Sequence, residues 1–217
     1  WEVRVEASAT SYLFVGVATQ CVFAPLNPQL TAPEIEFELE DLPAHAMILM
    51  EARLPAQKGN ALYESPKLVL ECCDANSVPV ITLLPDASVA GLFTLDSELS
   101  KTPGPAVPKA TKDDLALVLH TSGTTKKPKI VPLTHGNIGH GVQFVARTLR
   151  RQPDDVCINI MPLFHIHGVI ANIMVTLYSG SRVVCTRGFQ GGDDFLDKLA
   201  DDSLGPPTWY SAVPTMH

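Results

Sequence analysis

Short apolar runs alternate along the chain with longer stretches in which apolar residues recur at helical spacing. The apolar runs predict strands at 22–24, 46–52, 80–84, 115–119, 156–160, 182–186 and 208–212. The longer stretches predict helices at 8–21, 31–41, 60–77, 134–150, 165–178 and 193–202. This alternation is typical of an α/β domain, in which a mostly parallel sheet is layered with helices.

Local signals support several of these elements. Thr31 is a good N-cap for the helix of 31–41, with Pro33 in its first turn and Glu34 at the capping-box position. Thr134 is expected to cap the helix that follows it. Pro66 must start or kink the helix of 60–77, because proline removes a backbone donor from a helix interior.

The segment 85–111 is rich in Pro, Ser and Gly, and its "KTPGPAVPK" run is incompatible with a regular element. We interpret it as a connection rather than a domain boundary, because the α/β alternation resumes beyond it. The sequence therefore predicts one partial α/β domain over 1–217, made of a first portion (1–84), this connection (85–111) and a last portion (112–217).

One stretch tests whether the chain enters a membrane. No charged residue occurs between Asp155 and Arg182, a run long enough to span a bilayer. It contains Asn159, Asn172 and two histidines, however, which are costly in hydrocarbon. We therefore expect a buried strand, a loop and a buried helix here, and no transmembrane segment.

The charge balance limits the classes of partner. The 16 basic and 23 acidic residues give a net charge of −7, which argues against a broad nucleic-acid footprint. Charged residues make up 18% of the chain, against about 25% in typical soluble domains. We expect much of the surface to be covered, either by the remainder of the same chain or by a larger assembly.

The cysteines indicate the redox environment. They are odd in number, form no CxxC pair and lie mostly in apolar surroundings: Cys21, Cys72, Cys73, Cys157 and Cys185. Reduced thiols in an intracellular compartment are expected, with cytoplasm, peroxisome and another organelle such as a plastid left open. The chain begins at Trp1 rather than at a methionine, which indicates processing, truncation or partial coverage.

A loop dense in small donors and cations follows the apolar run of 115–119. A loop that leaves the carboxyl end of a parallel strand is where open α/β sheets bind ligands. Successive N–H groups and hydroxyls suit phosphate oxygens, and a lysine adds a point charge. The residues with these properties are Thr121, Ser122, Gly123, Thr124, Thr125 and Lys129. Neither GxxxxGK[ST] nor GxGxxG is present, so a Thr-rich surface turn stays open as the alternative.

Four stretches together resemble one known family. They are "VFAPLNPQLTAPEIEFELED" (22–41), "HTSGTTKKPKIVPLTH" (120–135), "MPLFHIHG" (161–168) and "TWYSAVPTMH" (208–217). In wording, order and spacing they resemble the AMP-forming adenylate synthetases: acyl-CoA synthetases, luciferases and peptide-synthetase adenylation domains. The resemblance covers nearly the whole chain, and the wording is most similar to the oxalate–CoA ligase and peroxisomal-type branch.

The resemblance implies an activity and its substrates. Such enzymes condense a carboxylate with ATP, release pyrophosphate, and pass the acyl group from the acyl-adenylate to coenzyme A. It therefore implies ATP with Mg²⁺, coenzyme A and a small carboxylic acid as ligands. Thr121–Thr125 and Lys129 would hold the β- and γ-phosphates.

The resemblance also implies roles for two histidines and for the residues around the acyl pocket. His165 would be catalytic, beside the reacting carboxylate, and His167 and Gly168 would line the acyl pocket together with Ser211, Val213 and Pro214. A polar His167 favours a small or polar acid. From the residues alone, His-x-His can equally be two ordinary loop histidines, and 208–212 a plain core strand. A metal site would need further ligands, and we expect none.

Two positions depart from the family pattern, which commonly has glycine at Lys126 and at Ile130. A β-branched Ile130 cannot readily take a positive φ, so we expect altered loop geometry there. The adenosine-binding motifs and the small C-terminal lid domain of the family are expected beyond His217, so the chain alone should not complete a turnover.

Three functions remain open at this point. The first is an ATP-dependent carboxylic acid–CoA ligase, of which this chain is the phosphate-binding and acyl-pocket part. The second is a truncated, non-catalytic relative recruited as a structural subunit of a larger assembly. The third is a stand-alone nucleotide-binding module.

Overall fold

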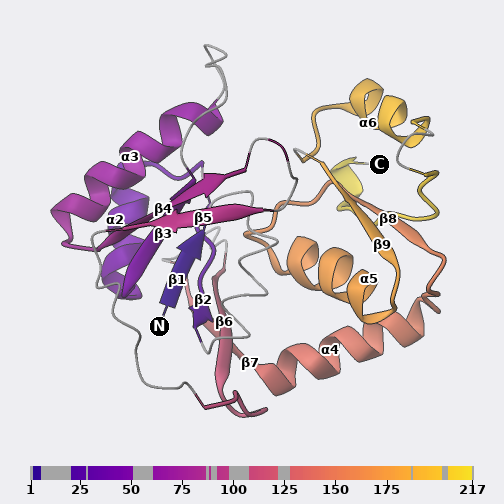
Figure 1. The fold of residues 1–217 in the computed structure, drawn as a ribbon, viewed down its shortest axis with the longest axis horizontal. Coiled ribbons are helices and arrows are strands. Elements are labelled where there is room, and N and C mark those ends of the chain that lie inside the picture. Colours follow the sequence, from indigo (N-terminus) through magenta and orange to yellow (C-terminus); the bar gives the residue numbers. More distant parts are fainter. Residues whose placement is uncertain are drawn as a thin grey trace. The chain divides into compact units, whose positions relative to one another are not determined.

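The computed structural model describes residues 2–5, 21–27, 29–50, 61–86, 88, 92–97, 108–121, 128–186, 188–201 and 205–216. They fall into two compact units, Trp1–Leu133 and Thr134–His217 (Figure 1). The predicted division into 1–84, 85–111 and 112–217 stays a prediction.

The first unit is built on a seven-stranded sheet with the order β5-β4-β3-β1-β2-β6-β7. Its strands are β1 (Glu2–Val5), β2 (Val22–Phe23), β3 (Ala46–Met50), β4 (Val80–Pro85), β5 (Phe93–Asp96), β6 (Leu115–His120) and β7 (Ile130–Thr134). The pairs β1–β2, β1–β3, β2–β6 and β3–β4 are parallel, and β5 is antiparallel to β4. The predicted α/β class with a mostly parallel sheet is confirmed.

Two helices pack on this sheet, α2 (Ala32–Asp41) and α3 (Ala61–Ala75), which lie side by side in Figure 1. The core between them and β3 consists of Leu26, Ile35, Leu39, Met47, Leu49, Val69, Cys72 and Cys73. The helix α3 begins five residues before Pro66, so the first of the two alternatives, that Pro66 starts the helix, is wrong, and the kink stays a prediction.

The predicted start of α2 is confirmed at Thr31. The Glu34 carboxylate accepts hydrogen bonds from the Thr31 backbone N–H at 2.8 Å and from its hydroxyl at 2.7 Å. These donors, the backbone N–H first, lower the pKa of Glu34 because they stabilise its charged form. The orphan N–H of the N-cap is thereby satisfied by a side chain one turn ahead.

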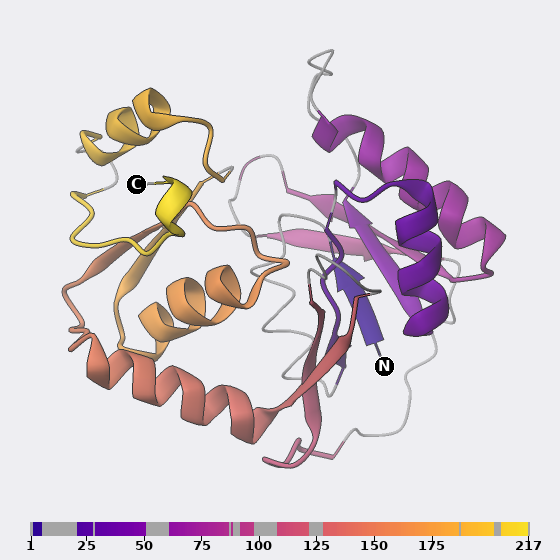
Figure 2. The same ribbon diagram turned by 180° about the vertical axis from the view of Figure 1, so that it is seen from behind.

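The second unit is built around two parallel strands, β8 (Val156–Asn159) and β9 (Arg182–Cys185). Its helices are α4 (His135–Thr148), the π-helix η1 (His167–Met174), α5 (Val175–Tyr178), α6 (Gly192–Leu199) and the 3₁₀-helix η3 (Pro214–Met216). The helices η1 and α5 contact both α4 and the strands (Figure 2).

Side chains of β8 alternate between two faces, as expected for a strand. Ile158 and Ile160 pack against Phe195 of α6. Asn159 points the other way, where its side-chain oxygen meets Asn172 of η1. The part of the charge-free run in and directly after β8 is therefore covered on both faces within the second unit. No helix in the described ranges is long and apolar enough to cross a membrane.

Several elements differ from the sequence prediction. The predicted connection 85–111 contains β5, and the loop region after β6 is followed by β7. The predicted strand 208–212 is reduced to one bridge between Trp209 and Cys157. The predicted helix 165–178 begins at His167 as a π-helix. The predicted helix 8–21 lies almost wholly outside the described residues.

Candidate functional site

The base of the predicted phosphate loop is closed by two hydrogen bonds at the end of β6. The Thr121 N–H donates to the Lys129 carbonyl oxygen at 2.9 Å, and the Lys129 N–H donates to Thr121 Oγ1 at 3.0 Å. The Thr121 hydroxyl proton is still available to a ligand. Ser122, Gly123, Thr124 and Thr125 lie outside the described residues. The Lys129 residue is exposed, and its ammonium group makes no ion pair with the described part of the chain.

Ile130 has ordinary strand geometry as the first residue of β7. Among the described non-glycine residues only Ser77 and Arg150 have a positive φ. The Ile130 side chain instead packs beside Ala24 and Val118. Whether Ile130 alters the geometry of the loop stays a prediction, because residues 122–127 lie outside the described residues.

A buried histidine lies directly before this loop. His120, the last residue of β6, has its Nδ1 3.5 Å from a Glu38 carboxylate oxygen and its Nε2 3.4 Å from an Asp41 carboxylate oxygen. Both carboxylates belong to α2. The end of the strand that leads into the loop is thus held against the last turns of a helix.

His165 lies in the turn between β8 and η1. The His165 backbone N–H donates to the Pro162 carbonyl oxygen at 3.3 Å, and the His165 backbone carbonyl oxygen accepts from the Val169 N–H at 3.1 Å. The imidazole lies 4.5 Å from the Phe164 ring, centroid to centroid. Neighbouring atoms desolvate it and lower the pKa of His165. Since the ordinary value is about 6.5, this ring is mostly neutral at neutral pH.

Three of the predicted acyl-pocket residues come together within the second unit. His167 Nε2 lies 2.8 Å from Ser211 Oγ. Gly168 is next to His167, and a Cβ built on it would lie 2.3 Å from the Pro162 carbonyl oxygen. The turn after β8 and the start of η1 can approach this closely only because residue 168 has no side chain. Val213 is half-buried and Pro214 is exposed at the start of η3.

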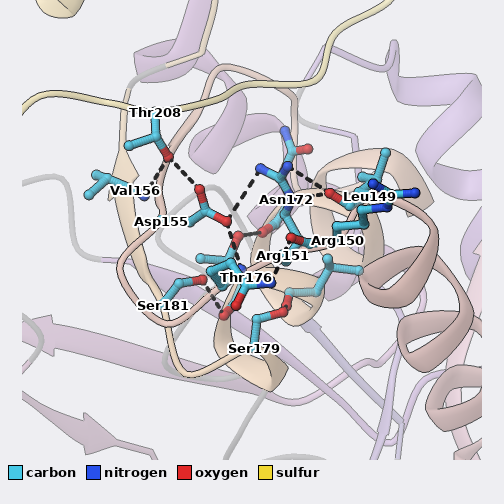
Figure 3. Close-up of polar contacts among 12 residues, drawn as sticks. Leu149, Arg150, Arg151, Asp155, Val156, Asn172, Thr176, Ser179, Ser181 and Thr208 are labelled. Atoms are coloured by element: carbon cyan, nitrogen blue, oxygen red, sulfur yellow. Dashed lines mark hydrogen bonds and ion pairs between the residues drawn. The ribbon is translucent and has the colours of Figure 1, made fainter.

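The segment that carries Ser211 is fixed to β8 by residues that the sequence prediction missed (Figure 3). Thr208 Oγ1 donates to Asp155 Oδ1 at 2.8 Å and accepts from the Val156 N–H at 3.0 Å. The Thr208 N–H donates to the Val156 carbonyl oxygen at 2.8 Å. The Gln152 N–H, and after it Thr208 and the Arg151 charge, lower the pKa of Asp155.

A buried polar cluster lies behind the His167–Ser211 pair. The Asn172 side-chain N–H₂ donates to Asn159 Oδ1 at 2.8 Å and to the Ser211 carbonyl oxygen at 3.2 Å. A sequence signal exists for both asparagines, because they are polar positions within the charge-free run 156–181. Within the described residues no group of three or more His, Cys, Asp or Glu has the arrangement of a metal site.

Comparison with known proteins identifies relatives. The chain is 34% identical over 208 residues to a probable CoA ligase of Humulus lupulus, covering 93% of this chain and 36% of that protein. It is 33% identical over 202 residues to an oxalate–CoA ligase of Arabidopsis thaliana, covering 93% of this chain and 37% of that protein. The chain thus spans little more than a third of the length of these curated relatives.

Solved structures show the same fold. ATP-bound MatB from Rhodopseudomonas palustris matches with a TM-score of 0.73 at 24% identity, over 99% of this chain and 39% of that one. An O-succinylbenzoate coenzyme A synthetase from Bacillus subtilis, in complex with ATP and magnesium ion, matches with a TM-score of 0.70 at 22% identity, again over 99% and 39%. The family described as AMP-binding enzyme matches residues 12–217, almost the whole chain, and the chain therefore belongs to that family.

Proposed function

We propose that the protein containing this chain is an AMP-forming carboxylic acid–CoA ligase that activates a small or polar acid. The observation that carries the proposal is the Thr/Ser/Gly/Lys loop at the carboxyl end of β6, whose two ends are joined through Thr121 and Lys129. Membership of the AMP-binding enzyme family and relatives named as CoA ligases support it.

In the first step a carboxylate oxygen of the acid attacks the α-phosphorus of ATP. The bond to the β-phosphate oxygen breaks, and pyrophosphate leaves with the electron pair. Thr121–Thr125 would hold the β- and γ-phosphates through N–H and hydroxyl donors, and the Lys129 ammonium group would neutralise charge on the leaving group. We expect Mg²⁺ to arrive with the nucleotide, since this ion is commonly held by substrate phosphates and water.

His165 would act beside the reacting carboxylate. Because its pKa is lowered, the imidazole is neutral at working pH and can donate one N–H without forming a tight ion pair with the acid. A neutral N–H donor can hydrogen-bond to the carboxylate before the attack and to the phosphoryl oxygens as negative charge develops on them. In the second step the thiol of coenzyme A attacks the acyl carbon, and AMP leaves.

The acid is proposed to be small and polar, with dicarboxylates as the first class to test. His167 and Ser211 place an imidazole and a hydroxyl next to each other on the predicted acyl wall. A polar acid can make further hydrogen bonds to such groups, whereas a long alkyl chain cannot. Relatives named as oxalate–CoA ligase in Arabidopsis thaliana and Saccharomyces cerevisiae and as malonate–CoA ligase in Bos taurus agree with this class.

Acid-dependent exchange of pyrophosphate into ATP tests the proposal in the full-length protein. We expect exchange with oxalate or malonate and little with octanoate. Lys129→Ala should slow it about a hundredfold, as expected for loss of one well-placed charge contact. Lys67→Ala is the matched control, since Lys67 is an exposed lysine that forms an ion pair with Glu71 on the surface of α3. A folded protein that exchanges with none of a panel of acids would contradict the proposal and favour a non-catalytic subunit.

A further inference from the structure

Two asparagines are buried where β8, η1 and the segment of Ser211 meet. Asn172 is 0% exposed and Asn159 is 4% exposed. Side chains of this type are rarely buried unless each polar atom has a partner. Their contacts therefore indicate what the cluster is built to hold.

Both protons of the Asn172 amide are used. One goes to Asn159 Oδ1 and the other to the Ser211 carbonyl oxygen. The Asn159 amide is itself fixed by Met161, whose N–H donates to Asn159 Oδ1 at 3.2 Å and whose carbonyl oxygen accepts from Asn159 Nδ2 at 3.1 Å. With an acceptor at each end, the Asn172 amide has one favourable orientation.

This orientation leaves Asn172 Oδ1 buried without a hydrogen-bond partner among the described residues. An unpaired buried oxygen is destabilising, so packing alone does not explain an asparagine here. A leucine of similar size would avoid this cost, but it would lose both donated hydrogen bonds. The asparagine is therefore better explained by what its amide positions.

The π-helix explains how Asn172 and His167 reach the same residue. They are separated by five positions, which in an α-helix would place them about 140° apart around the axis. In a π-helix the backbone bonds run from i to i+5, so these two positions lie close to one face. From that face His167 Nε2 contacts Ser211 Oγ and Asn172 contacts the Ser211 carbonyl oxygen.

We propose that Asn172 is a positioning residue, which holds the Ser211 backbone so that the Ser211 hydroxyl fixes the position of the His167 imidazole through its Nε2. The substrate side of this inference rests on the proposed function, because only there does His167 face the acid. Its expected consequence is tighter binding of the acid, with no direct effect on ATP.

Asn172→Leu tests the proposal, with Thr176→Val as the matched control. Thr176 is also 0% exposed and lies one turn further along the same helical run. Its hydroxyl donates to the Asn172 carbonyl oxygen, and its own carbonyl oxygen accepts from the Ser181 hydroxyl, so its hydrogen bonds do not involve the His167 or Ser211 side chains. Both substitutions remove buried hydrogen bonds without changing the number of side-chain heavy atoms, and only the first releases Ser211.

The first readout does not depend on activity. In full-length protein labelled with ¹⁵N-histidine, the imidazole ¹⁵N shifts of His167 report the hydrogen bond at its Nε2. We expect the wild type and Thr176→Val to share the same Nε2 shift, and Asn172→Leu to move it toward the value of a solvated imidazole. If Asn172→Leu leaves the His167 shifts unchanged, or if both variants change them equally, the positioning role is refuted.

The second readout is kinetic. Asn172→Leu should raise KM for the acid about tenfold while KM for ATP stays within twofold, and Ser211→Ala should do the same. The double variant should be no worse than either single one, because both act through one hydroxyl. Additive effects would overturn the proposal. If Asn172→Leu does not fold, Asn172→Ala replaces it in both readouts.

The two claims fail separately. A wild-type protein that exchanges pyrophosphate with no acid overturns the proposed function, and the His167 spectra still decide the role of Asn172. A wild-type protein that is active, with unchanged spectra in Asn172→Leu, overturns only the positioning role.

Discussion

Gly168→Ala should destabilise the second unit strongly, although it adds a single methyl group in a helix. A Cβ at this position would lie 2.3 Å from the Pro162 carbonyl oxygen and 3.0 Å from two further backbone atoms, the Met161 oxygen and the Pro162 carbonyl carbon. Backbone atoms cannot rotate away as the end of a side chain can. The turn after β8 must move, and we expect a loss of about 2–3 kcal/mol, the upper part of the range for overpacking.

Gly139→Ala is the matched control, because it is the same chemical change in α4 and nothing lies within 4 Å of the added Cβ. There alanine should stabilise the helix by about 0.5–1 kcal/mol, since glycine loses more backbone entropy on folding. The two variants should therefore differ by about 3 kcal/mol.

Urea unfolding measures this difference. It can be followed by circular dichroism. The midpoints should move in opposite directions with an unchanged slope m. A Gly168→Ala variant as stable as Gly139→Ala would refute the close approach between η1 and the turn at Pro162.

Three further predictions concern the second unit. Folding lowers the pKa of Asp155, so the stabilisation that the Asp155 carboxylate contributes is present above about pH 4 and is lost as the pH falls through the folded pKa. Asp155→Asn should therefore flatten the acidic part of a plot of urea midpoint against pH. An unchanged slope of that plot in Asp155→Asn would contradict the role of this carboxylate. Thr208→Val should lower the free energy of unfolding by about 1 kcal/mol in the same urea assay, because it removes the bonds to Asp155 and to the Val156 N–H. Burial raises the pKa of Cys157 to about 11, so a disulfide reagent at pH 8 should modify the exposed Cys185 quickly and Cys157 only after unfolding. Mass spectrometry of the peptides measures both modifications, and equal rates at the two cysteines would contradict the prediction.

Elements with strong local signals could be predicted from the sequence. The helix α2 starts where Thr31 and Glu34 place it, because its cap is made by residues three positions apart. The strand β6 could be predicted because its core residues are apolar and buried on both faces, as in a central parallel strand.

Elements that depend on distant partners could not be predicted. The strand β5 is exposed over most of its length and exists because it pairs with β4, which no local pattern reports. The π-helical conformation of η1 could not be predicted either, because the spacing of its apolar residues also fits an α-helix.

The candidate site also has one part that local sequence signals predict and one part that depends on residues distant in the sequence. The phosphate loop could be proposed from the residues themselves, because its chemistry lies in one short stretch. The role of Asn172 could not, because its two partners lie 13 and 39 positions away in the sequence. Only the fold brings Asn159 and Ser211 to one side of η1.

Product analysis of the full-length protein with ATP, coenzyme A and oxalate or malonate tests the ligase proposal most directly. Chromatography of one reaction should show AMP, pyrophosphate and the acyl-CoA thioester in equal amounts, and none of them without the acid. Formation of ADP and phosphate, or no product from a folded protein across the panel of acids, would contradict it.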